Sequence, residues 1–143
     1  MTKPMRYLAV DLGTKRTGLA TGDSVLKLVQ PLEVLQVARG PALLDAIARA
    51  VKDVGPDAIV LGLPLNMDGT EGAASRDARA FAQTLAARVN LPVHLQDERL
   101  TSFDAEQRMA QSGRTHKAKR ELRDALAACA VLEDFLGASS TEQ

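Results

Sequence analysis

The chain of 143 residues is poor in cysteine, in aromatic residues and in net charge, and each shortage excludes a class of protein. Its single cysteine cannot form an internal disulfide, which argues against a small secreted domain held together by disulfides. Aromatic residues make up 3% of the chain and Trp is absent, so aromatic platforms that stack single-stranded bases are not expected. Because the formal net charge is +0 at pH 7, any nucleic acid must be bound through local basic patches.

Long hydrophobic runs are also missing. No stretch has the length of a membrane span or the pattern of a secretory signal, so we expect a cytoplasmic protein without a membrane partner. Apolar residues still make up 45% of the chain, which is enough for one hydrophobic core. We therefore expect residues 1–143 to form a single domain, with frayed ends at 1–5 and 138–143.

The order of apolar runs and chain breakers predicts an α/β fold. The predicted strands are apolar runs bounded by turn residues: 7–11, 16–21, 26–37, 58–63 and 92–96. The predicted helices have apolar residues at helical spacing: 41–54, 74–89, about 101–111 and 119–136. The first three strands favour an antiparallel meander, in which Pro31 marks an edge or bulged strand. The later strand–helix–strand units need parallel strands, so the prediction is a mixed five-stranded sheet with helices on both faces.

Acidic or polar residues follow three of these strands, at the ends where ligands gather in sheets of this kind. Asp11 ends the first strand, the loop at 64–72 follows the fourth, and Asp97 and Glu98 follow the fifth. Carboxylates on one rim are the ligands that hard cations prefer, and two such ions can assist phosphodiester cleavage. Adjacent residues of a strand point to opposite faces, so only one of Asp97 and Glu98 should reach the site. The pattern does not choose between them.

A third acid is expected from the last helix. Asp124 heads a helical stripe of uncharged residues, which points it toward the sheet more than toward solvent. The alternative is an exposed ion pair with Arg120, one helical turn earlier, which would contribute only a few tenths of a kcal/mol.

Basic and polar residues near these acids could bind a nucleic-acid backbone. The segment 114–123 has five Lys or Arg residues and one acid. It overlaps a basic loop predicted at 112–119, which could contact phosphates without reading the base sequence. Arg99 could fix a phosphate or simply pair with Asp97 or Glu98. The candidate substrate-binding residues are Gly13, Thr14, Lys15, Arg16, Asn66, Thr70, Arg99, Arg114, Lys117, Lys119 and Arg120.

Four motifs, at 9–18, 60–71, 97–102 and 117–125, resemble the YqgF/RuvX family in order and spacing. The resemblance covers essentially the whole chain and implies a ribonuclease H-like fold. It also implies Mg²⁺ or Mn²⁺, expected as two ions, bound by the catalytic acids Asp11, Glu98 (or Asp97) and Asp124. Members of the family are described as Holliday junction resolvases and as nucleases for the 5′ end of precursor 16S ribosomal RNA. The implied activity is metal-dependent endonucleolytic cleavage of RNA in ribosome biogenesis or, alternatively, of four-way DNA in recombination.

Two other functions compete with this interpretation. Residues 11–14 also resemble the phosphate loop of actin-like kinases, but those proteins close two such domains around a nucleotide and this chain provides one. A non-catalytic scaffold bound to ribosomal RNA would bind without cleaving. A symmetric four-way junction would in addition favour a two-fold homodimer.

Overall fold

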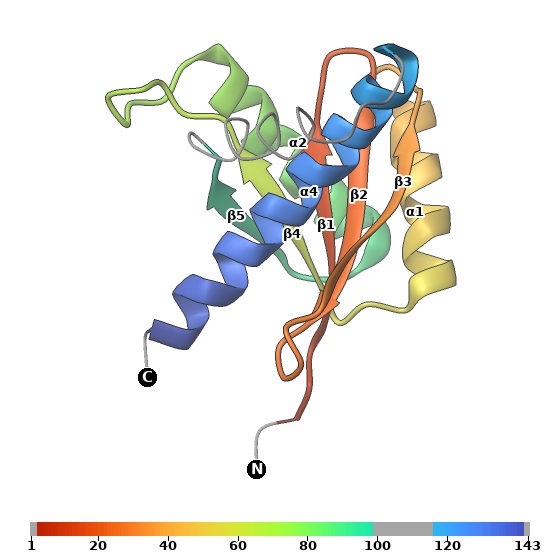
Figure 1. Cartoon of the computed structure of the whole chain (residues 1–143). Coiled ribbons are helices and arrows are strands. Elements are labelled where there is room, and N and C mark those ends of the chain that lie inside the picture. Colours follow the sequence, from red (N-terminus) through yellow and green to blue (C-terminus); the bar gives the residue numbers. More distant parts are fainter. Residues whose placement is uncertain (1–2, 99–115, 142–143) are drawn as a thin grey trace.

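Five strands form one mixed sheet, with helices on both of its faces (Figure 1). The computed structural model describes residues 3–98 and 116–141, and for 116–122 and 138–141 it describes the backbone alone. The strands are β1 (Arg6–Leu12), β2 (Thr17–Asp23), β3 (Val29–Leu35), β4 (Ala58–Leu63) and β5 (Val93–Asp97). The helices are α1 (Pro41–Val54), α2 (Ala73–Val89) and α4 (His116–Thr141).

The strands lie in the order β3-β2-β1-β4-β5. The pairs β3–β2 and β2–β1 are antiparallel, whereas β1–β4 and β4–β5 are parallel, as the sequence predicts. The predicted edge position of Pro31 is confirmed: β3 is an edge strand, and its pairing with β2 shifts register between Leu19 and Ala20. A proline costs little there because it has no N–H to donate to a further strand.

The alternation of residues along β1 assigns each side chain to one face of the sheet. Leu8 and Val10 belong to the core beneath α1 and α2, whereas Ala9 belongs to the smaller core beneath α4. Asp11 continues the Ala9 series and therefore lies on the α4 face. Figure 1 shows α4 crossing this face of the sheet, with α1 and α2 behind.

The helix ends follow the breakers in the sequence. Pro41 occupies the first turn of α1, where its missing N–H has no partner to lose. Gly55 and Asn90 end α1 and α2 in the left-handed conformation, and each donates its N–H to the residue four positions earlier. The predicted stops of both helices are confirmed.

The second and third strands differ from their predicted ranges. The second runs over Thr17–Asp23 instead of 16–21, and the third over Val29–Leu35 instead of 26–37. The Asp23 carboxylate accepts hydrogen bonds from the backbone N–H groups of Val25 and Leu26, at 2.9 and 2.6 Å. This side chain stabilises a turn where the apolar residues alone predict strand.

The last helix begins earlier and ends later than predicted. It spans His116–Thr141, so residues 116–119 of the predicted basic loop are helical, and the helix continues beyond the predicted end at 136. Its register along the sheet is fixed by apolar residues near its middle, including Ala128 and Leu132. The predicted helix at about 101–111 lies outside the described residues. None of the described helices is both long and apolar enough to cross a membrane.

Candidate active site

The carboxyl ends of β1, β4 and β5 meet at one edge of the sheet. Because β1 and β4 are in register at Val10 and Leu61, the next residues along, Asp11 and Gly62, are neighbours. Glu98 directly follows β5, and its backbone N–H donates to the Leu63 carbonyl at 3.2 Å. Two of the predicted strand-end acids are thereby brought to the same rim.

Asp11 and Glu98 share a hydrogen bond between their carboxyl groups. Burial, this hydrogen bond and the charges of Asp11 and Asp97 together raise the pKa of Glu98 from 4.5 to about 9. Burial also raises the pKa of Asp11; the hydrogen bond from Glu98 opposes this shift and the charge of Asp124 adds to it. Two carboxyl groups in this position hold one proton between them, because both cannot be ionised at low cost.

Glycine at position 62 leaves the space that the Glu98 carboxylate occupies. A Cβ at Gly62 would collide with the Glu98 carboxylate oxygen Oε2. Glu98 thus lies on the same face of the sheet as Asp11. Asp97 pairs with Leu63, whose side chain belongs to the core beneath α1 and α2. The structure therefore brings Glu98, and not Asp97, to Asp11.

Asp124 reaches the site from α4. Its carboxylate oxygen Oδ2 accepts a hydrogen bond from Arg16 Nε at 2.6 Å. A Cβ at Gly18, the β2 partner of Asp11, would collide with the Asp124 backbone carbonyl, so α4 and the sheet touch at this point. The charge of Asp124 contributes to the raised pKa of Asp11, which places the third acid within electrostatic range of the pair.

The four predicted residues of the β1–β2 turn have different surroundings. The Gly13 N–H donates to the Arg16 carbonyl at 2.9 Å and closes the turn. Thr14 and Lys15 are exposed at its tip, whereas Arg16 is turned toward α4. Thr14 and Lys15 are therefore open to a ligand, and Arg16 already has a partner within the chain.

The loop after β4 is held by its own polar groups. Asn66 Nδ2 donates to the Thr70 hydroxyl at 3.0 Å, and that hydroxyl donates to Asp68 Oδ1 at 2.6 Å. The Asn66 N–H donates to the Thr70 carbonyl, which closes the loop a second time. Both predicted residues are exposed, so the loop presents a fixed polar surface near the rim.

Several predicted contacts cannot be placed at the site. Arg99 and Arg114 lie outside the described residues. Lys117, Lys119 and Arg120 belong to the first turns of α4, where the structure describes the backbone alone. The role of Gly62 was not predicted from the sequence, because a glycine within the apolar run 58–63 is equally consistent with ordinary packing.

The three acids are not assembled as a metal centre. Among the side chains that the structure describes, no group of three or more His, Cys, Asp or Glu could hold a metal ion. Asp11 and Glu98 meet, while Asp124 is paired with Arg16. The donor set still fits a hard cation, since it consists of carboxylate oxygens only. The proton shared by Asp11 and Glu98 neutralises their negative charge, and a cation could take its place.

The shared proton predicts a pH-dependent stability of the protein in EDTA. The Glu98 carboxyl loses its proton near pH 4.5 when unfolded but keeps it to about pH 9 when folded. The folded state therefore binds more protons in this window, and the free energy of unfolding should fall as the pH rises from 4.5 to 9. Urea unfolding at several pH values measures this. Glu98→Gln should flatten the dependence, and an unchanged slope in that variant would contradict the assignment.

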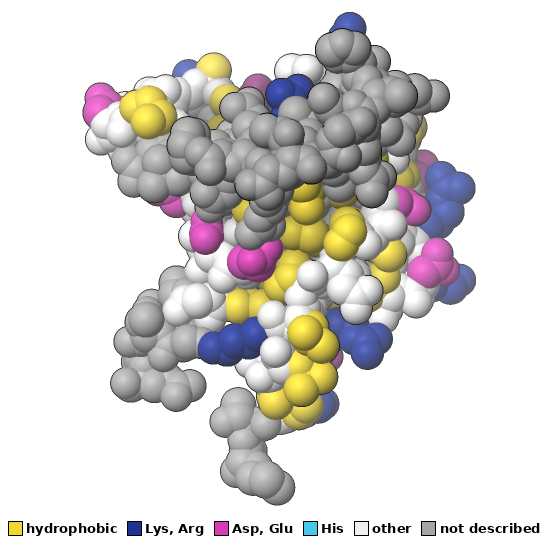
Figure 2. All heavy atoms as spheres, in the orientation of Figure 1, with side chains coloured by type: hydrophobic (Ala, Val, Ile, Leu, Met, Phe, Trp, Pro, Cys, Tyr) yellow, Lys and Arg dark blue, Asp and Glu magenta, His cyan; other side chains and the backbone are white. Residues whose placement is uncertain are grey.

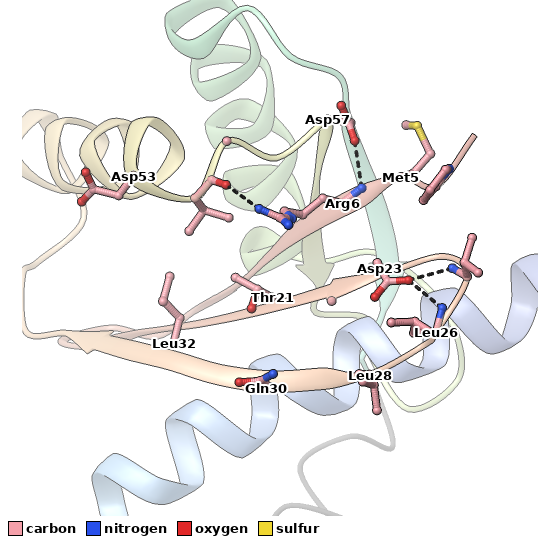
Figure 3. A pocket seen from close by; sticks show the side chains of 15 residues that line it. Met5, Arg6, Thr21, Asp23, Leu26, Leu28, Gln30, Leu32, Asp53 and Asp57 are labelled. Atoms are coloured by element: carbon pink, nitrogen blue, oxygen red, sulfur yellow. Dashed lines mark hydrogen bonds between the residues drawn. The ribbon is translucent and has the colours of Figure 1, made fainter. Parts of the chain in front are cut away.

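A groove lies at the opposite end of the sheet. It has a volume of about 840 Å³ and lies between the β2–β3 hairpin and the end of α1 (Figure 3). Leu26 and Leu28 border it and are 69% and 60% exposed, and yellow side chains gather in the lower part of Figure 2. Arg6, at the start of β1, also lines the groove, whereas the acids lie at the carboxyl end of that strand. It is not part of the acidic site.

Comparison with solved structures identifies the class of fold. Thermus thermophilus RuvC in complex with Holliday junction substrate has a TM-score of 0.60 at 16% identity, covering 96% of this chain and 96% of that chain. The fowlpox virus Holliday junction resolvase has a TM-score of 0.60 at 14% identity, covering 94% and 99%. The chain thus has the ribonuclease H-like fold of these resolvases, as predicted.

Sequence comparison then identifies the family. The family model RuvX, described as "Holliday junction resolvase", matches residues 5–138. A protein of Anaeromyxobacter sp. (strain Fw109-5) is 46% identical over 132 residues, which are 92% of this chain and 96% of the relative. One of Azotobacter vinelandii (strain DJ) is 42% identical over 137 residues, 95% of this chain and 96% of the relative. Both bear the name "Putative pre-16S rRNA nuclease". The chain belongs to the RuvX (YqgF) family.

Proposed function

We propose that this chain is a metal-dependent nuclease that hydrolyses phosphodiester bonds at the rim formed by β1, β4 and β5. The single observation that supports this best is the contact between the partly buried carboxyl groups of Asp11 and Glu98, with Asp124 in electrostatic range. Two contacting carboxyl groups that are partly removed from water lower the stability of a fold. Such an arrangement is typical of a functional site, where a ligand makes use of it. The family name and the names of the relatives point to the same class of reaction.

Asp11, Glu98 and Asp124 would hold Mg²⁺ or Mn²⁺, expected as two ions. Bound divalent cations lower the pKa of water and neutralise charge that develops on phosphate oxygens. Asp11 lies between the β2 and β4 sides of the site and would be the central acid of the three that hold the ions. Glu98 and Asp124 would supply further carboxylate oxygens, and the proton shared by Asp11 and Glu98 would have to be released for Glu98 to bind.

The remaining residues would position the nucleic-acid backbone. Lys15 is exposed on the turn next to Asp11 and can meet a phosphate. The Asn66–Thr70 loop presents fixed polar groups that can contact a phosphate or sugar. The basic residues of 114–120 would add contacts that depend on salt and not on base sequence. These roles remain predictions, as does the extension of one nuclease domain over 1–143.

We propose precursor 16S ribosomal RNA as the substrate, because the relatives bear the name "Putative pre-16S rRNA nuclease" over almost the full chain. Cleavage at its 5′ end, in the cytoplasm, is a further expectation from the sequence. The family description favours a second candidate, four-way DNA, which would be cut most simply by a two-fold dimer. A non-catalytic scaffold on ribosomal RNA is the third. It gives no reason for two partly buried acids to be in contact.

Cleavage of two substrates side by side tests these proposals. A precursor 16S 5′ leader and a four-way DNA junction would each be incubated with Mg²⁺, Mn²⁺ or EDTA. Metal-dependent cutting of the leader alone is the expected result. Paired symmetric cuts in the junction would favour the resolvase and a dimer. Binding of both substrates without cleavage under any condition would reject the nuclease and favour the scaffold.

A further inference from the structure

Arg16 has a partner that its position in the sequence does not suggest. It lies in the turn after β1, yet its Nε is 2.6 Å from the Asp124 carboxylate, 108 positions later in the chain. The two side chains are only 28% and 21% exposed. An arginine whose only role is to bind a substrate phosphate would ordinarily be exposed to solvent, as the neighbouring Lys15 is.

The ion pair is fixed from both sides. The Gly13–Arg16 hydrogen bond closes the turn and limits where Arg16 can reach. On the other side, the contact between Gly18 and the Asp124 backbone holds α4 against β2. Neither partner therefore depends on a flexible backbone to meet the other. The pair is a built feature of the site and differs from an exposed ion pair such as Arg88–Asp45.

The charges explain what the pair does. Three carboxyl groups converge on this rim, and two of them share one proton. The Asp124 carboxylate lies within electrostatic range of Asp11, and Arg16 places a positive charge in direct contact with it. When divalent cations supply positive charge instead, the Arg16–Asp124 contact is no longer required. Arg16 then lies beside the site with donors for a phosphate oxygen.

We propose that Arg16 is a positioning residue that holds Asp124 before the metal binds, competes with the metal for that carboxylate, and then turns to the substrate phosphate. The inference rests on the proposed nuclease function. It predicts effects of opposite sign when Arg16 is removed: the metal binds more tightly, because a competing charge is gone, and the nucleic acid binds less tightly, because a phosphate contact is gone. A purely structural ion pair does not predict tighter metal binding together with weaker nucleic-acid binding.

Isothermal titration with Mn²⁺, without nucleic acid, tests the first effect. Arg16→Met should bind Mn²⁺ about tenfold more tightly than the natural chain, and Arg16→Lys, which keeps the charge, should remain close to the natural chain. In the Asp124→Asn background, Arg16→Met should change Mn²⁺ affinity little, because the contested carboxylate is gone. Arg88→Met is the matched control, since it breaks the 2.7 Å Arg88–Asp45 ion pair between α2 and α1, on the other face of the sheet from α4.

Binding of the RNA leader or junction in the presence of Mn²⁺ tests the second effect. Arg16→Met should weaken it about tenfold. Unchanged or weaker Mn²⁺ binding by Arg16→Met, with melting temperature retained, would overturn the proposal. If Arg16→Met does not fold, Arg16→Gln with the same titration decides. If the natural chain binds no Mn²⁺ at all, the proposal of a metal-dependent nuclease fails. If the natural chain binds Mn²⁺ and Asp11→Asn does not, the nuclease proposal stands even when Arg16→Met leaves Mn²⁺ affinity unchanged.

Discussion

Asp11→Asn is expected to lose metal-dependent cleavage by at least ~10³-fold while remaining folded. Asparagine has nearly the same shape, so the packing on the α4 face should be retained. It cannot provide a negative oxygen pair to a cation, and its neighbours on β2 and β4 are Gly18 and Gly62, which have no side chain to replace it. Single-turnover cleavage with saturating Mn²⁺ and Mn²⁺ titration measure the two losses separately.

Thermal melting in EDTA gives this prediction a second readout. Burial raises the pKa of the Asp11 carboxyl, which means that its charge costs stability in the folded chain. Asp11→Asn should therefore melt at the same temperature as the natural chain or higher. Loss of cleavage together with a large fall in melting temperature would mean that Asp11 supports the fold, and the catalytic assignment would lose its support.

Asp97→Asn distinguishes the two adjacent acids. Asp97 pairs with Leu63, on the side of the sheet away from α4, whereas Glu98 contacts Asp11. We expect Asp97→Asn to retain cleavage within about threefold, since a change of one charge outside the metal ligands has a modest effect, and Glu98→Gln to lose it. The reverse result would contradict the assignment of Glu98 and would mean that the Asp97 side chain is the one that faces Asp11 when substrate is bound.

The sequence was sufficient to place the acids at one rim, for reasons that β1 illustrates. The run Leu8–Val10 predicts a strand buried on both faces, and its end at Asp11 follows from the glycine and polar residues beyond. The connection lengths then require β1, β4 and β5 to be parallel, and parallel neighbours end at the same edge. Periodicity and chain direction are local signals, so they could be used without the structure.

The partner of Asp124 could not be predicted in the same way. Helical spacing offers Arg120 as its nearest basic neighbour, and nothing local indicates Arg16. The contact depends on where α4 crosses the sheet, which is decided by small residues on two strands and a stripe on the helix. The choice between Asp97 and Glu98 has the same origin. It depends on Gly62 of β4, a neighbour in space that no spacing rule connects to Glu98.

The limits of the β2–β3 hairpin show a third kind of difference. Residues such as Val25 and Leu26 have strand propensity, yet they lie in the turn with large exposed fractions of 58% and 69%. The Asp23 side chain binds their N–H groups and ends β2 before them. Hydrogen bonds to the Asp23 side chain, and not the apolar pattern, determine the backbone conformation here. The third strand therefore begins later than predicted.

Gly18→Ala is expected to destabilise the protein by about 1–3 kcal/mol, because an added methyl group has no room between β2 and α4. The Cβ would meet the carbonyl oxygen and carbon of Asp124, which are backbone atoms and cannot turn aside. Relief requires α4 to move away from the sheet. That movement would open the core that contains Ala20 and Leu132 and would carry Asp124 away from Asp11. Urea unfolding measures the loss of stability.

Gly62→Ala is the matched control, because its methyl group would meet the end of the Glu98 side chain instead of backbone. A flexible carboxylate can move, so the free energy of unfolding should change less than in Gly18→Ala. The displaced Glu98 should nevertheless weaken Mn²⁺ binding, since it no longer lies beside Asp11. Gly18→Ala with natural stability would contradict the close approach of α4. Gly62→Ala with natural Mn²⁺ affinity would show that the space above Gly62 is not needed by the ligand, and that Glu98 binds the ion from another position.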